Sequence, residues 1–171
     1  MKNLSVIIAI LGICSLGLNA QDRFPVRQLT FNPAQQGFPT WSPDGKYIIY
    51  QHSDMHDSLG NNGLWRISSS GTGAKQIFNE LAEHPKWSPD GSLVVFDADT
   101  GNSIKMIPAE GGEPIVFLPD SIHIEHGGLP CWSPDGTQIA FLERDNLSVC
   151  VYDARKGEIN SIFRKEGLLP M

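Results

Sequence analysis

A Glu-His pair occurs twice in the sequence, each time a few residues before a tryptophan. Imidazole and carboxylate groups are good ligands for a divalent transition metal when several of them converge. The two histidines stand at unequal distances from their tryptophans, so the alternative is that these are polar loop residues that hydrogen-bond where a strand begins. The candidate metal ligands are Glu83, His84, His123, Glu125 and His126.

Other chemical motifs are weak or missing. Residues 97–102, Asp-Ala-Asp-Thr-Gly-Asn, resemble the start of a calcium loop but lack the later glutamate, so we expect a hairpin turn there. A Gly-x-Ser-x-Gly nucleophile elbow, a phosphate-binding glycine loop and a Cys-x-x-Cys pair are absent from the sequence. We therefore predict no catalytic residues and no cofactor.

A motif of five residues, Trp-Ser-Pro-Asp-Gly, occurs three times, and the repeat that contains it must position the candidate metal ligands. The copies begin 46 and then 45 residues apart, and a fixed period in this range marks a solenoid, a propeller or an array. Proline fixes φ for a tight turn, serine and aspartate bond the nearby backbone, and glycine takes a left-handed position. We therefore interpret the aspartates as turn formers and the tryptophans as packing between repeats. The copies are Trp41, Ser42, Pro43, Asp44, Gly45; Trp87, Ser88, Pro89, Asp90, Gly91; and Trp132, Ser133, Pro134, Asp135, Gly136.

Each repeat contains four strand-like segments. The second segments, at 47–50, 93–96 and 139–142, are apolar without alternation. A strand that is apolar on both sides is covered on both faces, as in four-stranded sheets stacked face to face around an axis. The predicted fold class is all-β: a partial β-propeller of three four-stranded antiparallel blades.

The expected divisions of the chain follow from these repeats. A long polar loop is expected at 52–63, after the second strand of the first blade. The divisions are a signal peptide at 1–20, a lead-in at 21–37 with one strand at 27–31, blade 1 at 38–79, blade 2 at 80–119, blade 3 at 120–166, and the aborted start of a further blade at 167–171.

The repeated phrase at this period resembles the WD-repeat-like propeller repeat of the TolB family, over about Arg27 to Phe163. Similar repeats occur in the propeller domains of prolyl-oligopeptidase-type peptidases and in oligogalacturonate lyases. The resemblance to TolB implies a periplasmic platform for protein interactions, in a group of which some members serve envelope assemblies. The resemblance to the lyases implies a metal held by channel histidines, for which His84 and His126 are the candidates.

The chain departs from the TolB family in blade number, because that family's propeller has six blades and follows an α/β domain. Residues 167–171 echo residues 128–132, as though a fourth first strand began there. Three explanations remain open: a truncated reading frame or gene fragment, two or more copies that complete a ring, or an open arc of three blades. We expect at least one terminal blade to expose an apolar face.

The start of the chain and its composition bound location and partners. A short positive start, the apolar stretch Leu4–Leu18 and the small residue Ala20 are typical of a secretory signal peptide, which implies a periplasmic or secreted protein. The net charge of −6 argues against a nucleic-acid surface, and we expect no membrane span after removal of the signal. Cys131 and Cys150 should lie on the first and third strands of one repeat, about 9 to 10 Å apart, and are expected to be buried free thiols.

These observations predict an exported TolB-like propeller repeat protein that serves as a protein- or peptide-binding scaffold in the cell envelope, and not an enzyme. The partner is expected to be a protein or peptide, held at the channel face or along a blade edge. A second copy of the chain that completes a ring is a further expected partner. The alternative is a fragment related to a propeller enzyme, with either an oligogalacturonate-lyase-like metal site or the non-catalytic propeller domain of a prolyl-oligopeptidase-type peptidase.

Overall fold

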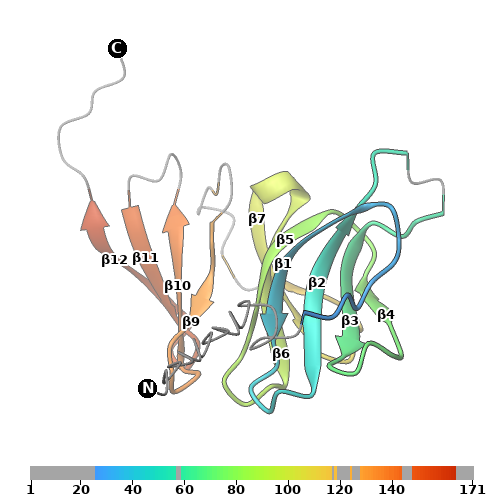
Figure 1. Cartoon of the computed structure of the whole chain (residues 1–171). Helices are drawn as coiled ribbons and strands as arrows, with labels where there is room; N and C mark the ends of the chain where they lie inside the picture. The colour runs from blue at the N-terminus through green and yellow to red at the C-terminus, as the bar shows by residue number, and fades with distance from the viewer. Residues whose placement is uncertain are drawn as a thin grey trace, which may run out of the picture.

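The computed structural model describes residues 26–56, 59–116, 118, 124, 128–143 and 148–164, which form three four-stranded antiparallel sheets (Figure 1). In each sheet the strands follow one another in sequence order, which is the arrangement of a propeller blade. The predicted fold class, a partial β-propeller of three blades, is confirmed. Blade 1 comprises β1 (Gln35–Trp41), β2 (Tyr47–Ser53), β3 (Gly63–Ser68) and β4 (Lys75–Phe78); blade 2 comprises β5 (Ala82–Trp87), β6 (Leu93–Ala98), β7 (Ser103–Pro108) and β8 (Ile115–Val116), with the 3₁₀ turn η1 (Asp99–Gly101) after β6; blade 3 comprises β9 (Cys131–Trp132), β10 (Gln138–Glu143), β11 (Ser148–Asp153) and β12 (Glu158–Arg164).

Two apolar clusters hold the blades together, one at each junction. Strand β6 shows the principle, because Val94 and Phe96 belong to the cluster shared with blade 1 while Val95 belongs to the cluster shared with blade 3. All three side chains are fully buried, and each such burial stabilises the fold by about 1.5 to 3 kcal/mol. The continuous apolar run of this strand is therefore explained by burial on both faces of the sheet.

The repeated phrase forms the same turn in each blade. In blade 1 the N–H of Gly45 donates to the carbonyl of Ser42 at 2.9 Å, and the Ser42 hydroxyl donates to Asp44 Oδ1 at 2.7 Å. Asp44 Oδ1 also accepts the N–H of Lys46 at 3.1 Å, and the N–H of Tyr47 donates to Ser42 Oγ at 2.9 Å. The aspartate therefore joins the turn to the second strand. The corresponding bonds in the other blades involve Ser88 with Asp90 and Ser133 with Asp135.

Turns of neighbouring blades stack through proline and glycine. A Cβ atom on Gly91 would lie 3.6 Å from Pro43 Cδ, and one on Gly136 would lie 3.5 Å from Pro89 Cδ. Both glycines have positive φ, of 74° and 70°. Glycine therefore has two roles in these turns. It adopts the left-handed conformation, and its lack of a side chain leaves room for the proline of the preceding blade.

The three tryptophans of the repeat do not share one environment. Trp87 and Trp132 pack against the clusters between blades, and Trp87 Nε1 donates to the carbonyl of Thr40 on β1 at 3.2 Å. The buried indole N–H of Trp132 finds no acceptor among the described residues. Trp41 is 59% exposed because no described blade precedes blade 1. The expected packing between blades therefore holds for two tryptophans and is wrong for the first.

Three local expectations are corrected. Residues 27–31 form no regular strand, because no described strand lies beside them to pair with, and they cross the outward face of blade 1 instead (Figure 1). Strand β2 continues to Ser53, so His52 is a buried strand residue and does not belong to the polar loop. Neither Cys131 nor Cys150 forms a disulfide, as expected, but Cys131 is exposed. Trp132 packs toward blade 2, so the alternation of the strand turns Cys131 away from it.

Segments outside the described residues include 1–20 and 167–171, where the signal peptide and the start of a further blade were expected. Among the described residues, no helix is long and apolar enough to cross a membrane.

The Ser-Asp bond of the turn predicts an unusual titration. The Ser42 hydroxyl, helped by the N–H of Lys46, lowers the pKa of Asp44 from 3.8 to about 2, and Ser133 does the same for Asp135. Stability from these carboxylates is present above pH 3.8 and lost as the pH falls toward 2. In a carboxyl-carbon NMR titration we expect Ser42→Ala to return the pKa of Asp44 toward 3.8 and to leave Asp135 unchanged. An unmoved Asp44 midpoint would contradict this role of the hydroxyl.

Candidate functional site

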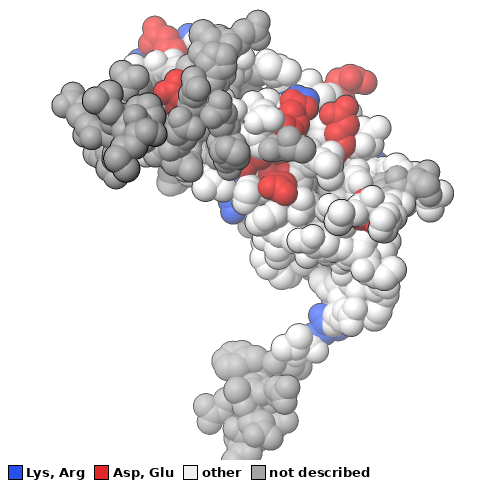
Figure 2. All heavy atoms as spheres, turned by 90° about the horizontal axis from the view of Figure 1, so that it is seen from above, with Lys and Arg blue, Asp and Glu red and all other residues white. Residues whose placement is uncertain are grey.

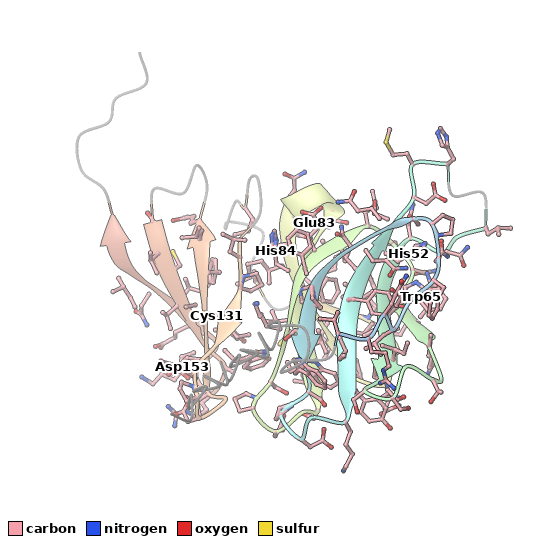
Figure 3. The ribbon with its side chains drawn as sticks, viewed as in Figure 1. His52, Trp65, Glu83, His84, Cys131 and Asp153 are labelled. Carbon is pink, nitrogen blue, oxygen red and sulfur yellow. The ribbon has the colours of Figure 1, made fainter. Side chains whose placement is uncertain are left out.

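The predicted metal ligands are only partly described. Glu83 and His84 lie side by side near one end of β5 (Figure 3), whereas His123, Glu125 and His126 lie outside the described residues. His52 lies apart from them in blade 1, beside Trp65 at 6.1 Å between ring centroids. Within the described part of the chain, no group of three His, Cys, Asp or Glu side chains could hold a metal ion.

A buried carboxylate holds His84. The Nδ1 atom of His84 lies 2.8 Å from Oδ2 of Asp97 on the neighbouring strand β6. The Asp97 side chain is fully buried, while a quarter of the His84 side chain remains exposed. A carboxylate in this position fixes the orientation and the tautomer of an imidazole ring.

Asp97 also connects blade 2 to blade 3. Its Oδ1 atom accepts the N–H of Gly128 at 2.8 Å, and its Oδ2 atom lies 3.3 Å from the N–H of Leu129, which donates to it. Burial raises the pKa of Asp97, although the bonds from His84 and from these two amides act in the opposite direction. Because both oxygens already accept bonds from the protein, this aspartate acts as a clamp between blades. The following residues Asp99–Gly101 form a 3₁₀ turn that joins β6 to β7, in line with the expected hairpin.

The junction between blades 1 and 2 has a related link. Gln51, buried on β2, occupies the position that Asp97 has on β6, and its Nε2 atom donates to Oε1 of Glu83 at 3.2 Å. Glu83 is thereby engaged in a contact between blades. Polar side chains near the end of the second strand thus link blade 1 to blade 2 and blade 2 to blade 3.

Three equivalent residues form a row along the first strands. Phe38, His84 and Leu129 each stand three positions before the tryptophan of their repeat, and each has a positive φ of 47° to 49°. Each costs roughly 1 kcal/mol or more, because a side chain in this conformation crowds the backbone. In blades 1 and 2 the register shifts here, as in a β-bulge, which re-aims the side chain. We name Phe38, His84 and Leu129 the bulge row.

The bulge row is an exposed surface at the inner edge of the sheets. Strand β5 contacts both β1 and β9, so the first strands of the three blades are neighbours. The rings of Phe38 and His84 lie 4.2 Å apart between centroids. Phe38 is 42% exposed and Leu129 is 48% exposed, so large apolar side chains flank the histidine that Asp97 orients.

Carboxylates dominate the charge around this end of the molecule. The view from above in Figure 2 looks onto the end at which Glu83 and His84 lie, and Asp and Glu side chains are spread over its described part. The whole chain carries 19 acidic and 13 basic side chains. A ligand that approaches this end therefore meets a negative potential, which favours basic groups.

The comparisons with known proteins place the fold. No protein-family model and no curated protein matches the sequence. Among solved structures, a putative TolB from Agrobacterium tumefaciens matches with a TM-score of 0.64 and 22% identity, over 79% of this chain and 51% of that one. This chain has a β-propeller fold. TolB from Acinetobacter baumannii matches with a TM-score of 0.61 and 23% identity, over 80% of this chain and 34% of that one.

Enzymes share the fold as well. An oligogalacturonate lyase in complex with manganese matches with a TM-score of 0.58 and 18% identity, over 80% of this chain and 39% of that one. The chain therefore spans about half or less of each similar structure. At these identities the likeness concerns the fold and does not choose between binding and catalysis.

The bulge row and the clamp are not among the residues predicted from the sequence. The signal for the row was alignment on the repeated tryptophan, which brings Phe38, His84 and Leu129 to one position although their types differ. The repeated Glu-His pairs do not show this correspondence, because His84 and His126 stand at different distances from their tryptophans. The signal for the clamp was Asp97 itself, a carboxylate at the end of an otherwise apolar second strand.

The clamp predicts a graded response to substitution. Asp97→Ala leaves the N–H of Gly128 without its acceptor and should lower the free energy of unfolding by about 2 to 3 kcal/mol. Asp97→Asn keeps an acceptor oxygen and should cost about half as much. Because burial raises the pKa of Asp97, the contribution of this residue to stability falls as the pH rises above 3.8. The difference in the free energy of unfolding between wild type and Asp97→Asn should therefore narrow toward neutral pH. Urea unfolding checks both points, and equal losses for the two variants would contradict the clamp.

Proposed function

We propose that this chain belongs to an exported propeller scaffold that binds a protein or peptide at the bulge row and does not transform it. The observation that carries the proposal is the strained, exposed row itself. Backbone strain repeated at three equivalent positions presents Phe38, His84 and Leu129 at the inner edge of the sheets. These side chains do not belong to the buried core, so a ligand could cover them without disturbing it. Strained residues concentrate where a surface is used for recognition.

The chemistry of the row defines the ligand. Two apolar side chains flank a partly exposed imidazole, so the complementary ligand carries an aromatic or branched aliphatic side chain. The surrounding carboxylates favour basic residues next to it. A peptide segment with one apolar anchor and basic flanks meets both conditions.

The described residues support a catalytic function less well than a binding function. The similar structures include a lyase with manganese and a puromycin hydrolase as well as TolB proteins. The pair of His84 and Asp97 is the part of the described site that could serve a metal or move a proton, but Asp97 is engaged in the clamp. A metal at His84 would need further ligands from His123, Glu125 and His126, which lie outside the described part of the chain.

Export to the envelope is the second element of the proposal. It rests on the apolar stretch Leu4–Leu18 behind a short positive start. The expected result is that the protein recovered from the periplasm or medium begins at Gln21, as measured by mass spectrometry of its N-terminal peptide. Recovery of the chain in the cytoplasm with residues 1–20 intact would contradict export.

Selection from a random peptide library tests the binding function. The selected peptides should carry an apolar anchor with basic neighbours, and Phe38→Ser or Leu129→Ser should weaken their binding at least tenfold, about 1.4 kcal/mol or more. Met55→Ser is the matched control, because Met55 is an exposed apolar side chain in the loop between β2 and β3 and does not belong to the row. Affinities are measured by fluorescence polarisation, with thermal unfolding to verify that each variant is folded. Failure to select any peptide, or equal binding by the row variants and wild type, would contradict the proposal.

A further inference from the structure

The internal junctions show how one blade receives another. The outer strand of blade 1 meets blade 2 at a glycine turn, where a Cβ atom on Gly111 would lie 3.3 Å from Cα of Ile77. Close by, Lys75 Nζ donates to the carbonyl of Glu110 at 2.6 Å. With the Trp87 indole bond and the proline-glycine stacking, these contacts define the receiving side of a blade.

Blade 1 presents the same receiving side to the outside. Trp41, the counterpart of Trp87, is largely exposed, and a Cβ atom on Gly45, the counterpart of Gly91, would meet nothing within 4 Å. A cavity of about 290 Å³ lies on this face, lined by residues of β1, β2 and β3 and by Leu29 and Thr30 of the lead-in. The counterparts of the tryptophan bond and of the proline-glycine stacking therefore have no partner among the described residues.

The lead-in fills the counterpart of the glycine-turn contact. A Cβ atom on Gly71, the counterpart of Gly111, would lie 3.2 Å from Cδ2 of Leu29 and 3.8 Å from its Cα atom. Two residues earlier, Arg27 Nη2 donates to the carbonyl of Ser69 at 2.8 Å, as Lys75 does to the turn of blade 2. Residues 27–31, which we name the strap, therefore occupy the position of a preceding blade's outer strand.

The outward face of blade 3 has the features that fit a receiving side. Ile162 lies in the β-bulge of β12 opposite β11, the position that Ile77 has in β4 opposite β3. Ile77 is 5% exposed on its glycine turn, whereas Ile162 is 70% exposed. Cys150 and Tyr152 pack toward blade 2, so strand alternation places Val149 and Val151 on the opposite, outward face.

We propose that a second copy of this chain docks its third blade on the outward face of blade 1, and that the strap is the exchangeable segment that holds this face until then. The inference is independent of the proposed peptide site. Two copies supply six blades in a head-to-tail ring, within the four to eight with which propellers close. Ile162 of the second copy and Leu29 of the strap require the same position on Gly71, so docking displaces the strap.

Sedimentation velocity of the exported chain tests this competition. Loosening the strap with Arg27→Ala and Leu29→Ser should tighten dimer formation at least tenfold relative to wild type. Gln28→Ala is the control within the strap, because the Gln28 side chain bonds the strap's own Thr30 carbonyl and should leave the dimer unchanged. Adding Ile162→Asp to the loosened chain should abolish the dimer, whereas Val116→Asp, at an exposed apolar residue of blade 2, should not.

A peptide experiment on the unmodified chain protects the test against misfolded variants. A synthetic peptide of residues 26–32 competes for the strap position, so excess peptide should dissociate the dimer that wild type forms at high concentration. The proposal is overturned if the folded strap variant associates no more than wild type, if its association ignores Ile162→Asp or continues beyond two copies, or if the peptide leaves the wild-type dimer intact.

Discussion

The structure depends on one constraint: every blade has two apolar faces, and each must be covered by a neighbouring blade. The second strands express it most directly, since Val94 and Phe96 face one junction and Val95 the other. The repeated turn serves the same purpose, because its tryptophan enters the junction and its glycine receives the preceding proline. Burial between blades therefore supplies the core, and no blade could be stable alone.

The same constraint explains the features at the ends and at the inner edge. Where no described blade precedes or follows, identical residue types change environment: Trp41 is exposed while Trp87 is packed, and Ile162 is exposed while Ile77 is buried. At the inner edge, polar links such as the Asp97 clamp fix the first strand of the next blade. The strained bulge beside that link turns side chains out of the core and leaves Phe38 and Leu129 exposed.

Sequence reasoning reached the fold because the repeat is encoded locally. A Trp-Ser-Pro-Asp-Gly turn is held by contacts among its own residues, so its sequence predicts its shape. A continuous apolar second strand likewise predicts that both of its faces are buried. The site depends on contacts between blades, which no local pattern contains. Asp97 meets Gly128 from 31 residues away, and His84 aligns with Phe38 and Leu129 rather than with another histidine. The strap was predicted as a strand from its composition, but it lies on blade 1 without a described strand to pair with.

Comparison of Trp87→Ala with Trp41→Ala in urea unfolding at low micromolar concentration tests the central claim most directly. Trp41 and Trp87 each begin a Trp-Ser-Pro-Asp-Gly motif, so the effects of the substitution on the turn are the same at both positions. The two variants then differ only in the burial that is lost between blades. The account predicts that Trp87→Ala lowers the free energy of unfolding by about 3 to 5 kcal/mol, whereas Trp41→Ala changes it by less than about 1 kcal/mol. Equal losses at the two positions would contradict the claim that the junction between blades is the unit of stability.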